Sequence, residues 1–149
     1  MTSQFRLYLK LVVLLSAVVT MAACGGGEAG GSEAAGSMPA IALSEQTLDL
    51  GDMPNGEIAA REVAVRNDGD APLVVSTITT SCGCTTAALE PMTIAPGGSG
   101  TLRITFDSGA HGPDLRGPLM REVMIVSNDP ATPEAVVSVV VNILEPVTE

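Results

Sequence analysis

Two cysteines separated by one glycine, Cys82 and Cys84, are the residues whose type and spacing could support chemistry in this chain. Residues two apart in an extended strand point to the same face, with Cα atoms about 6 to 7 Å apart. Disulfides usually need Cα separations of about 4.4–6.8 Å, so an extended backbone lies at the limit of bonding. Gly83 can enter backbone conformations closed to other residues, which would draw the two cysteines together in a turn.

The cysteine pair has three interpretations, and the sequence leaves all of them open. It can be a structural disulfide, which is common outside the cytoplasm. It can be a reversible thiol pair, since a strained disulfide is easily reduced. It can also bind a soft metal ion, because two thiolates on one face suit Cu(I) or Zn(II).

A metal site at the cysteines would need further ligands. His111 is the one histidine of the chain and the first candidate. A zinc site would be expected to bring a second cysteine or histidine pair, and the sequence has none. We therefore expect no cofactor, with copper as the one alternative. Thioether ligands for it could come from the methionines after residue 24, which are Met38, Met53, Met92, Met120 and Met124.

Catalytic motifs are missing from the rest of the chain. Gly97-Gly98-Ser99-Gly100 predicts a hairpin turn, because it lacks the lysine and the helix of a phosphate-binding loop. No serine has the surroundings of a nucleophile elbow. Asp107, Asp114 and Asp129 have the sequence context of turns and loops. We therefore expect no catalytic residue and a protein that is not an enzyme.

The first 24 residues have the layout of an export signal. Arg6 and Lys10 precede an apolar run, Leu11 to Ala23, which is shorter than the ~20 residues of a membrane-spanning helix. Met21-Ala22-Ala23-Cys24 resembles the bacterial lipobox, which implies that Cys24 carries a lipid and becomes the new N-terminus. The alternative is an ordinary secretory signal that is cut near Ala23.

A Gly-rich segment, residues 25 to 37, has no periodicity and predicts a flexible linker. The expected organisation is a signal peptide at 1–23, a lipidated cysteine with its linker at 24–40, and one folded domain at 41–149. Gly25 follows the cysteine where an inner-membrane retention signal would have aspartate. We therefore expect a lipid anchor in the outer membrane or at the cell surface, with the domain outside the cytoplasm.

Charge and composition exclude some partners. The chain has 17 acidic and 7 basic residues, a formal net charge of −10. Such a surface repels phosphate backbones, so we expect no nucleic-acid partner. Phe106 is the one aromatic residue that remains after the leader, so stacking platforms for bases cannot be built.

From about Ile41 the sequence alternates apolar and polar residues in short runs that are separated by turn residues. This pattern is typical of an all-β sandwich, and about seven strands are expected. They centre on Leu48 and Leu50, Val63 and Val65, residues 73–80, the short piece 91–94, Leu102 to Phe106, Val123 and Ile125, and residues 135–144. The last run is apolar on both faces, so it should be central or covered on both sides.

Several motifs of this region resemble those of one known family. They are Asn67-Asp68-Gly69 with Pro72-Leu73, Ser81-Cys82-Gly83-Cys84-Thr85, Pro96-Gly97-Gly98, Phe106-Asp107, and Ser127-Asn128-Asp129-Pro130. Together they resemble the bacterial domain-of-unknown-function family fifteen-seventy-three, which is itself similar to the Ig-like ASH domains of centrosomal and ciliary proteins. The resemblance implies an immunoglobulin-like fold and an envelope setting, and it carries over no catalytic residue.

Two functions follow as expectations. The first is a membrane-tethered, non-enzymatic Ig-like module that binds another envelope protein, for example by adding a strand at a sheet edge. The second is a thiol-redox or copper-handling lipoprotein that uses Cys82 and Cys84.

Overall fold

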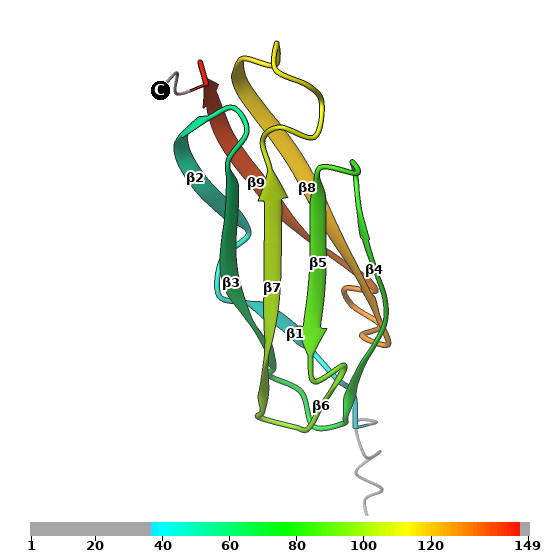
Figure 1. The fold of residues 1–149 in the computed structure, drawn as a ribbon. Coiled ribbons are helices and arrows are strands. Elements are labelled where there is room, and N and C mark those ends of the chain that lie inside the picture. Colours follow the sequence, from blue (N-terminus) through cyan, green and yellow to red (C-terminus); the bar gives the residue numbers. More distant parts are fainter. Residues whose placement is uncertain (1–36, 147–149) are drawn as a thin grey trace, which may run out of the picture. The chain divides into compact units, whose positions relative to one another are not determined.

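In the computed structural model, residues 37–146 are described and form two packed β-sheets (Figure 1). The strands are β1 (Ile41–Leu43), β2 (Thr47–Pro54), β3 (Ile58–Asn67), β4 (Leu73–Thr80), β5 (Thr85–Glu90), β6 (Thr93–Ile94), β7 (Ser99–Asp107), β8 (Gly117–Ser127) and β9 (Glu134–Leu144). One sheet has the order β1-β3-β7-β5 and the other β2-β9-β8-β4-β6. Neighbouring strands are antiparallel except β2 and β9, which are parallel.

Alternation along the strands builds the core between the sheets. On β9 the side chains of Ala135, Val137, Val139, Val141 and Ile143 are buried, while the residues between them face outward. Burial of such aliphatic side chains is the main stabilising term of the fold. A smaller cluster, in which Phe106 and Cys84 are buried with Met53, Val141 and Ile143, fills the end of the sandwich at the β4–β5 connection.

The all-β sandwich is confirmed, with nine strands in the described residues where about seven were expected. The two that the sequence did not predict are β1 and β5. Alternation is weak in β5, because its core-facing positions are Thr85, Ala87 and Leu89, of which only Leu89 is large and apolar. Residues 135–144 were expected to be central in a sheet or covered on both sides. The first alternative is confirmed, since β9 lies between β2 and β8.

The end of the sandwich at the β3–β4 connection is fastened by two buried polar side chains. Asn67 is 0% exposed. Its Oδ1 accepts from the N–H groups of Ala40 and Gly69, and its Nδ2 donates to the carbonyls of Ala71 and Ile94. This side chain therefore ties together three segments that are distant in the sequence.

Asp129 is the second buried fastener. Its carboxylate accepts hydrogen bonds from the backbone N–H groups of Ile41, Ala131 and Thr132. Desolvation by burial raises the pKa of Asp129, but the three N–H donors outweigh it and hold that pKa below its ordinary value. Asn67 and Asp129 belong to the motifs that carry the family resemblance, and in this structure both stabilise the fold.

The expected signal peptide, Cys24 and most of the linker fall in residues 1–36, which lie outside the described residues. Within residues 37–146 there is no helix long and apolar enough to cross a membrane. The first described segment runs along the β3–β4 connection, where the carbonyl of Met38 accepts from the N–H of Asp70.

Candidate functional site

The Cys-Gly-Cys motif forms the turn between β4 and β5, which belong to different sheets. Cys82 and Cys84 are joined by a disulfide, and their Cα atoms are 5.3 Å apart. The turn therefore brings the cysteines closer than an extended strand would, within the usual range for bonding. Cys84 is 2% exposed and Cys82 is half-buried.

Gly83 makes this turn in a different way from the one expected. The φ angle of Gly83 is not positive, so the turn uses no left-handed backbone at this position. A Cβ atom built on Gly83 would meet nothing within 4 Å. The closeness of the two cysteines thus comes from the reversal of the chain between two sheets, and glycine-specific backbone freedom is not its cause.

The residues on either side of the cysteines fix the turn. The N–H of Ser81 donates to the carbonyl of Glu122 on β8, and the Ser81 hydroxyl accepts from the N–H of Glu122. Thr85 is 2% exposed, and its Oγ1 lies 3.4 Å from the Sγ of Cys82 and 3.8 Å from that of Cys84. The serine and threonine of the Ser-Cys-Gly-Cys-Thr block therefore hold the turn to the sheet and line the disulfide.

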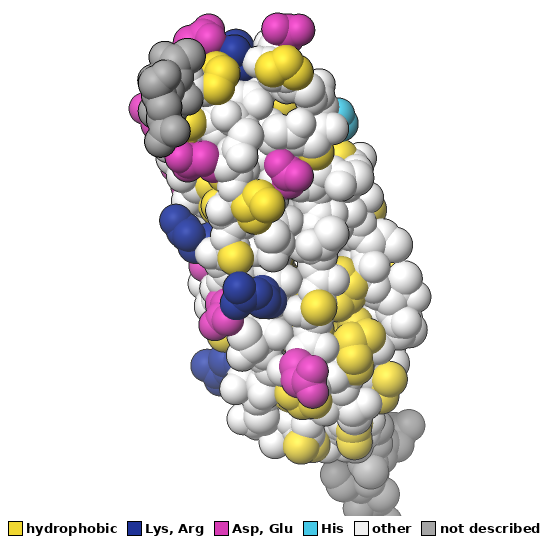
Figure 2. All heavy atoms as spheres, viewed as in Figure 1, with side chains coloured by type: hydrophobic (Ala, Val, Ile, Leu, Met, Phe, Trp, Pro, Cys, Tyr) yellow, Lys and Arg dark blue, Asp and Glu magenta, His cyan; other side chains and the backbone are white. Residues whose placement is uncertain are grey.

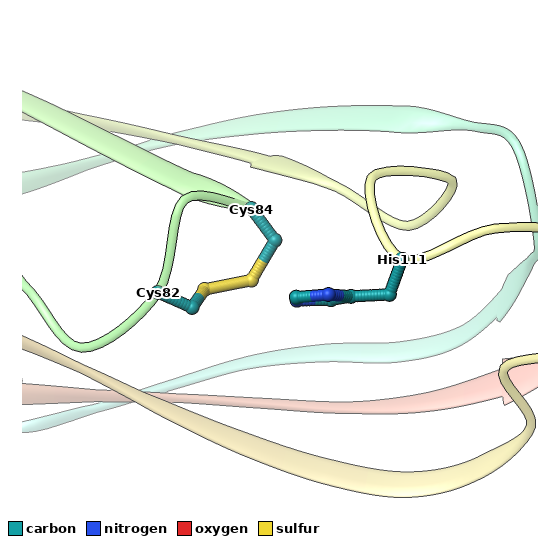
Figure 3. A group of neighbouring side chains, drawn as sticks. All are labelled: Cys82, Cys84 and His111. Atoms are coloured by element: carbon teal, nitrogen blue, oxygen red, sulfur yellow. A yellow bond between two sulfur atoms is a disulfide. The ribbon is translucent and has the colours of Figure 1, made fainter.

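His111 lies beside the disulfide, as Figure 3 shows, with its ring directed at the two sulfur atoms. It comes from the loop between β7 and β8, so the fold brings together residues that are far apart in the sequence. The sulfur atoms and a ring nitrogen of His111 all lie within 4.8 Å of one another. His111 is exposed, so the group is open to solvent on the histidine side.

Two polar residues that the sequence analysis missed hold the His111 loop in place. Asn55 is 8% exposed, and its Nδ2 donates to the carbonyls of Gly112 and Leu115 at 3.0 Å each. Ser108 is fully buried, and its hydroxyl is bonded to the β2–β3 turn, where it accepts from the N–H of Glu57 at 2.9 Å. In the sequence, Asn55 and Ser108 stand in turn-like segments. That position predicts a loop, but it does not predict hydrogen bonds to another loop.

The methionines suggested as copper ligands are spread over the molecule. Met53 is buried in the same cluster as Cys84. Met120 and Met124 alternate with the core-facing residues of β8, and Met120 is 58% exposed. Met38 and Met92 lie toward the opposite end, where their carbonyls accept from Asp70 and from Val75 near the start of β4. Of these five methionines, Met53 is therefore the one that packs in the cluster around the cysteines.

The arrangement defines an immunoglobulin-like β-sandwich with a disulfide and a histidine at one end. A similar fold is seen in the ASH/PapD-like domain 7 of human CEP192, with a TM-score of 0.56, 11% identity, and coverage of 74% of this chain and 89% of that domain. The sequence of residues 41–142 matches the family described as protein of unknown function DUF1573, and the chain belongs to this family.

Two further comparisons show the range of the fold. A protein of unknown function from Porphyromonas gingivalis W83 is 28% identical, with a TM-score of 0.62 over 71% of this chain, and the match spans about half (47%) of that protein. The VesB protease of Vibrio cholerae is 13% identical, with a TM-score of 0.55, over 70% of this chain and 32% of the protease. At that identity the comparison shows a similar fold and nothing about activity. No curated protein matches the sequence.

Proposed function

We propose that this protein is a non-enzymatic, lipid-anchored envelope module that binds an extended segment of another envelope protein by strand addition. The observation that carries the proposal is the open flank between β4 and β5. Strand β5 is the edge strand of its sheet on this side. Among the described strands of the other sheet, only the two-residue β6 lies beyond β4, and it pairs with Leu73 and Val74, so the rest of β4 has no neighbour on this side. Core-facing Ile78 and Ala87 stay half-buried there. Figure 2 shows hydrophobic side chains gathered on the lower part of this flank, toward β6.

The outer edge of β5 has backbone groups that suit an incoming strand. The N–H of Asp107 on β7 donates to the carbonyl of Cys84, so every second residue from Cys84 onward is bonded to β7. The residues between them, Ala87 and Leu89, point their N–H and C=O groups toward the free edge. Main-chain bonds of this kind provide affinity in strand addition, and side-chain pockets provide specificity.

The chemistry of the flank selects the partner segment. Six residues of β5 can pair with a segment of similar length. Alternate apolar side chains of that segment can cover Ile78 and Ala87 in the opening between the sheets. Because the chain is strongly acidic, the preferred segment is neutral or basic. Nucleic acid is not a partner in this proposal, for the same electrostatic reason.

Strand addition is tested by a photo-cross-linking residue at Ala88, which is exposed on β5, in cells that express the full chain. The control position is Thr47, an exposed residue on the free edge of β2, on the opposite flank. We expect one envelope protein to be captured from position 88 and not from position 47, with the cross-link in an extended segment. Equal capture at both positions, or none at 88, would refute the proposal.

A pair of proline variants sharpens this test. Ala87→Pro removes an edge N–H that makes no bond to β7, so the fold should tolerate it. Thr47→Pro is the matched control: the N–H of Ser138 donates to the carbonyl of Gln46, which directs the backbone groups of Thr47 away from β9. Both variants should unfold at similar urea concentrations, and only Ala87→Pro should lose the cross-link at position 88.

Membrane attachment through Cys24 is the second part of the proposal, and the lipobox-like segment supports it. Intact mass spectrometry of protein purified from its own membranes should show a chain that begins at Cys24 with a diacylglyceryl group. Cys24→Ser protein should be recovered free of membranes. Membrane fractionation should place the wild-type protein in the outer membrane or at the surface. An unmodified mature chain would contradict the anchor and leave the strand-addition test unaffected.

A further inference from the structure

We propose that the reduced form of the Cys82–Cys84 pair, together with His111, is a binding site for a soft monovalent metal ion, with Cu(I) as the ion that fits best. Among the described residues, these three are the group of cysteine, histidine and acidic side chains whose ligand atoms come within 4.8 Å of one another. They come from two loops at the same end of the sandwich (Figure 3). The site lies at the β4–β5 turn, directly before the β5 edge that strand addition would use, and the tests below measure metal binding without a partner protein.

The donor set favours Cu(I) over other metals. Two thiolates and one imidazole are soft or borderline ligands, and sulfur donors select Cu(I). Structural zinc sites are almost always tetrahedral with four protein ligands, and the described residues place no fourth cysteine, histidine or carboxylate in this group. Trigonal coordination by three ligands is common for Cu(I). Buried Met53, in the same cluster as Cys84, adds a thioether to the surroundings.

Distances agree with such a site. Metal–sulfur and metal–nitrogen bonds of about 2.0–2.3 Å put the ligand atoms of a trigonal centre about 3.5–4 Å apart. The sulfur and nitrogen atoms already lie within 4.8 Å of one another. Once the disulfide is open, rotation of the cysteine side chains would separate the sulfur atoms, and the turn would keep the two Cα atoms near their present 5.3 Å. Large backbone movements are therefore not needed.

The loops that bring the ligands together are held independently of the disulfide. Ser81 is bonded to Glu122 on β8 through both its N–H and its hydroxyl. Asn55 holds the His111 loop through two carbonyls, and Ser108 holds its start. Reduction therefore removes one covalent bond from an arrangement that hydrogen bonds maintain. Preorganised loops of this kind lower the cost of ordering the ligands when the metal binds.

The redox step needs an external dithiol as reductant. The dithiol transfers two electrons and two protons to the disulfide: its own sulfurs become a disulfide, and Cys82 and Cys84 become thiols. Binding of Cu(I) then releases two protons from the thiols, and the imidazole of His111 binds as the neutral ligand. The oxidised protein has no thiolate and should not bind. The site is thus available only in the reduced protein.

The test is a competition titration with Cu(I) alone, without oxygen, on the full mature protein in detergent. The protein is reduced with a phosphine, the phosphine is removed, and Cu(I) is delivered from a chromophoric chelator. We expect one Cu(I) per reduced chain, no competition by the oxidised protein, and sulfur and nitrogen neighbours in the X-ray absorption spectrum. A parallel titration with Zn(II) should show weaker competition against its own chelator.

Variants separate a metal site from a structural disulfide. His111→Ala should weaken Cu(I) binding at least about tenfold, a loss that even outer-shell changes cause at metal sites, and should remove the nitrogen neighbour. Asp114→Asn is the matched control, because it changes an exposed residue of the same loop that is not in the ligand group. Both residues are exposed, so the fold should survive. Equal affinity of the two variants, preference for Zn(II), or equal competition by reduced and oxidised protein would each overturn the proposal.

Discussion

Replacement of Asn67 by alanine should be among the most damaging single substitutions in this domain. The side chain is fully buried and makes four hydrogen bonds, at 3.2 and 3.0 Å to the N–H groups of Ala40 and Gly69 and at 2.7 and 3.0 Å to the carbonyls of Ala71 and Ile94. Each buried backbone group that loses its hydrogen-bond partner lowers the free energy of unfolding by about 1–3 kcal/mol. The total is less than four times that value, because water can replace the partner at the groups that are only part-buried. We therefore expect the free energy of unfolding to fall by about 3–5 kcal/mol.

That loss is a large fraction of the ~5–15 kcal/mol that stabilises a typical domain. Urea unfolding of the disulfide-bonded protein measures it: with a slope of about 2 kcal/mol per molar, the midpoint should fall by about 2 M. Asn142→Ala is the matched control, since the side chain of Asn142 makes one hydrogen bond, in which its Nδ2 donates to the carboxylate of Asp52 on the surface at 2.8 Å. Its cost should be about 0.5 kcal/mol. If Asn67→Ala loses no more stability than Asn142→Ala, the reasoning about the buried fastener is wrong.

Three other predictions concern two loop glycines and the pH dependence of stability. Gly83→Ala should change the free energy of unfolding by less than about 0.5 kcal/mol and leave the disulfide intact, because its Cβ would meet nothing within 4 Å. Gly69→Ala should be far more destabilising in the same urea assay, since its Cβ would overlap the Met38 carbonyl oxygen and lie 2.6 Å from the N of Ala40. Asp129 has a lowered pKa in the folded state, so its contribution is present above the unfolded carboxyl pKa of about 3.9 and is lost as pH falls through the folded pKa. Unfolding measured from about pH 2 to 6 should therefore show a steeper acid loss in the wild type than in Asp129→Asn, and equal slopes would contradict the assignment.

The fold was largely predictable because alternation is strong where the core is strong. Leu102, Ile104 and Phe106 alternate with polar residues, and this run is strand β7 in the structure. The pattern is weak in β5, whose core-facing threonine and alanine residues have little apolar area to mark them. β1 has three residues, which is too short for a period to be visible. Local pattern thus finds strands that contribute much buried area and misses short or weakly apolar edge strands.

The candidate site was predictable in its residue types and not in its geometry. Cys82, Cys84 and His111 were all candidates from the sequence, but so were five methionines. Selection among them depends on which loops meet at one end of the sandwich, and that is set by strand order. Asn55 and Ser108 were not predicted, since a side chain that holds a distant loop leaves no local pattern. The turn at Gly83 was expected for a reason that the structure contradicts.

The two ends of the domain differ in what they hold, and the two proposals concern different parts of the sandwich. The chain enters at the β3–β4 end, where Met38 bonds to Asp70. The disulfide and His111 lie at the other end of β4, whose eight residues span about 25 Å. Strand β5 starts directly after Cys84 and runs from this end back toward the other as an edge strand, so the metal-site proposal concerns one end of the sandwich and the strand-addition proposal concerns one edge.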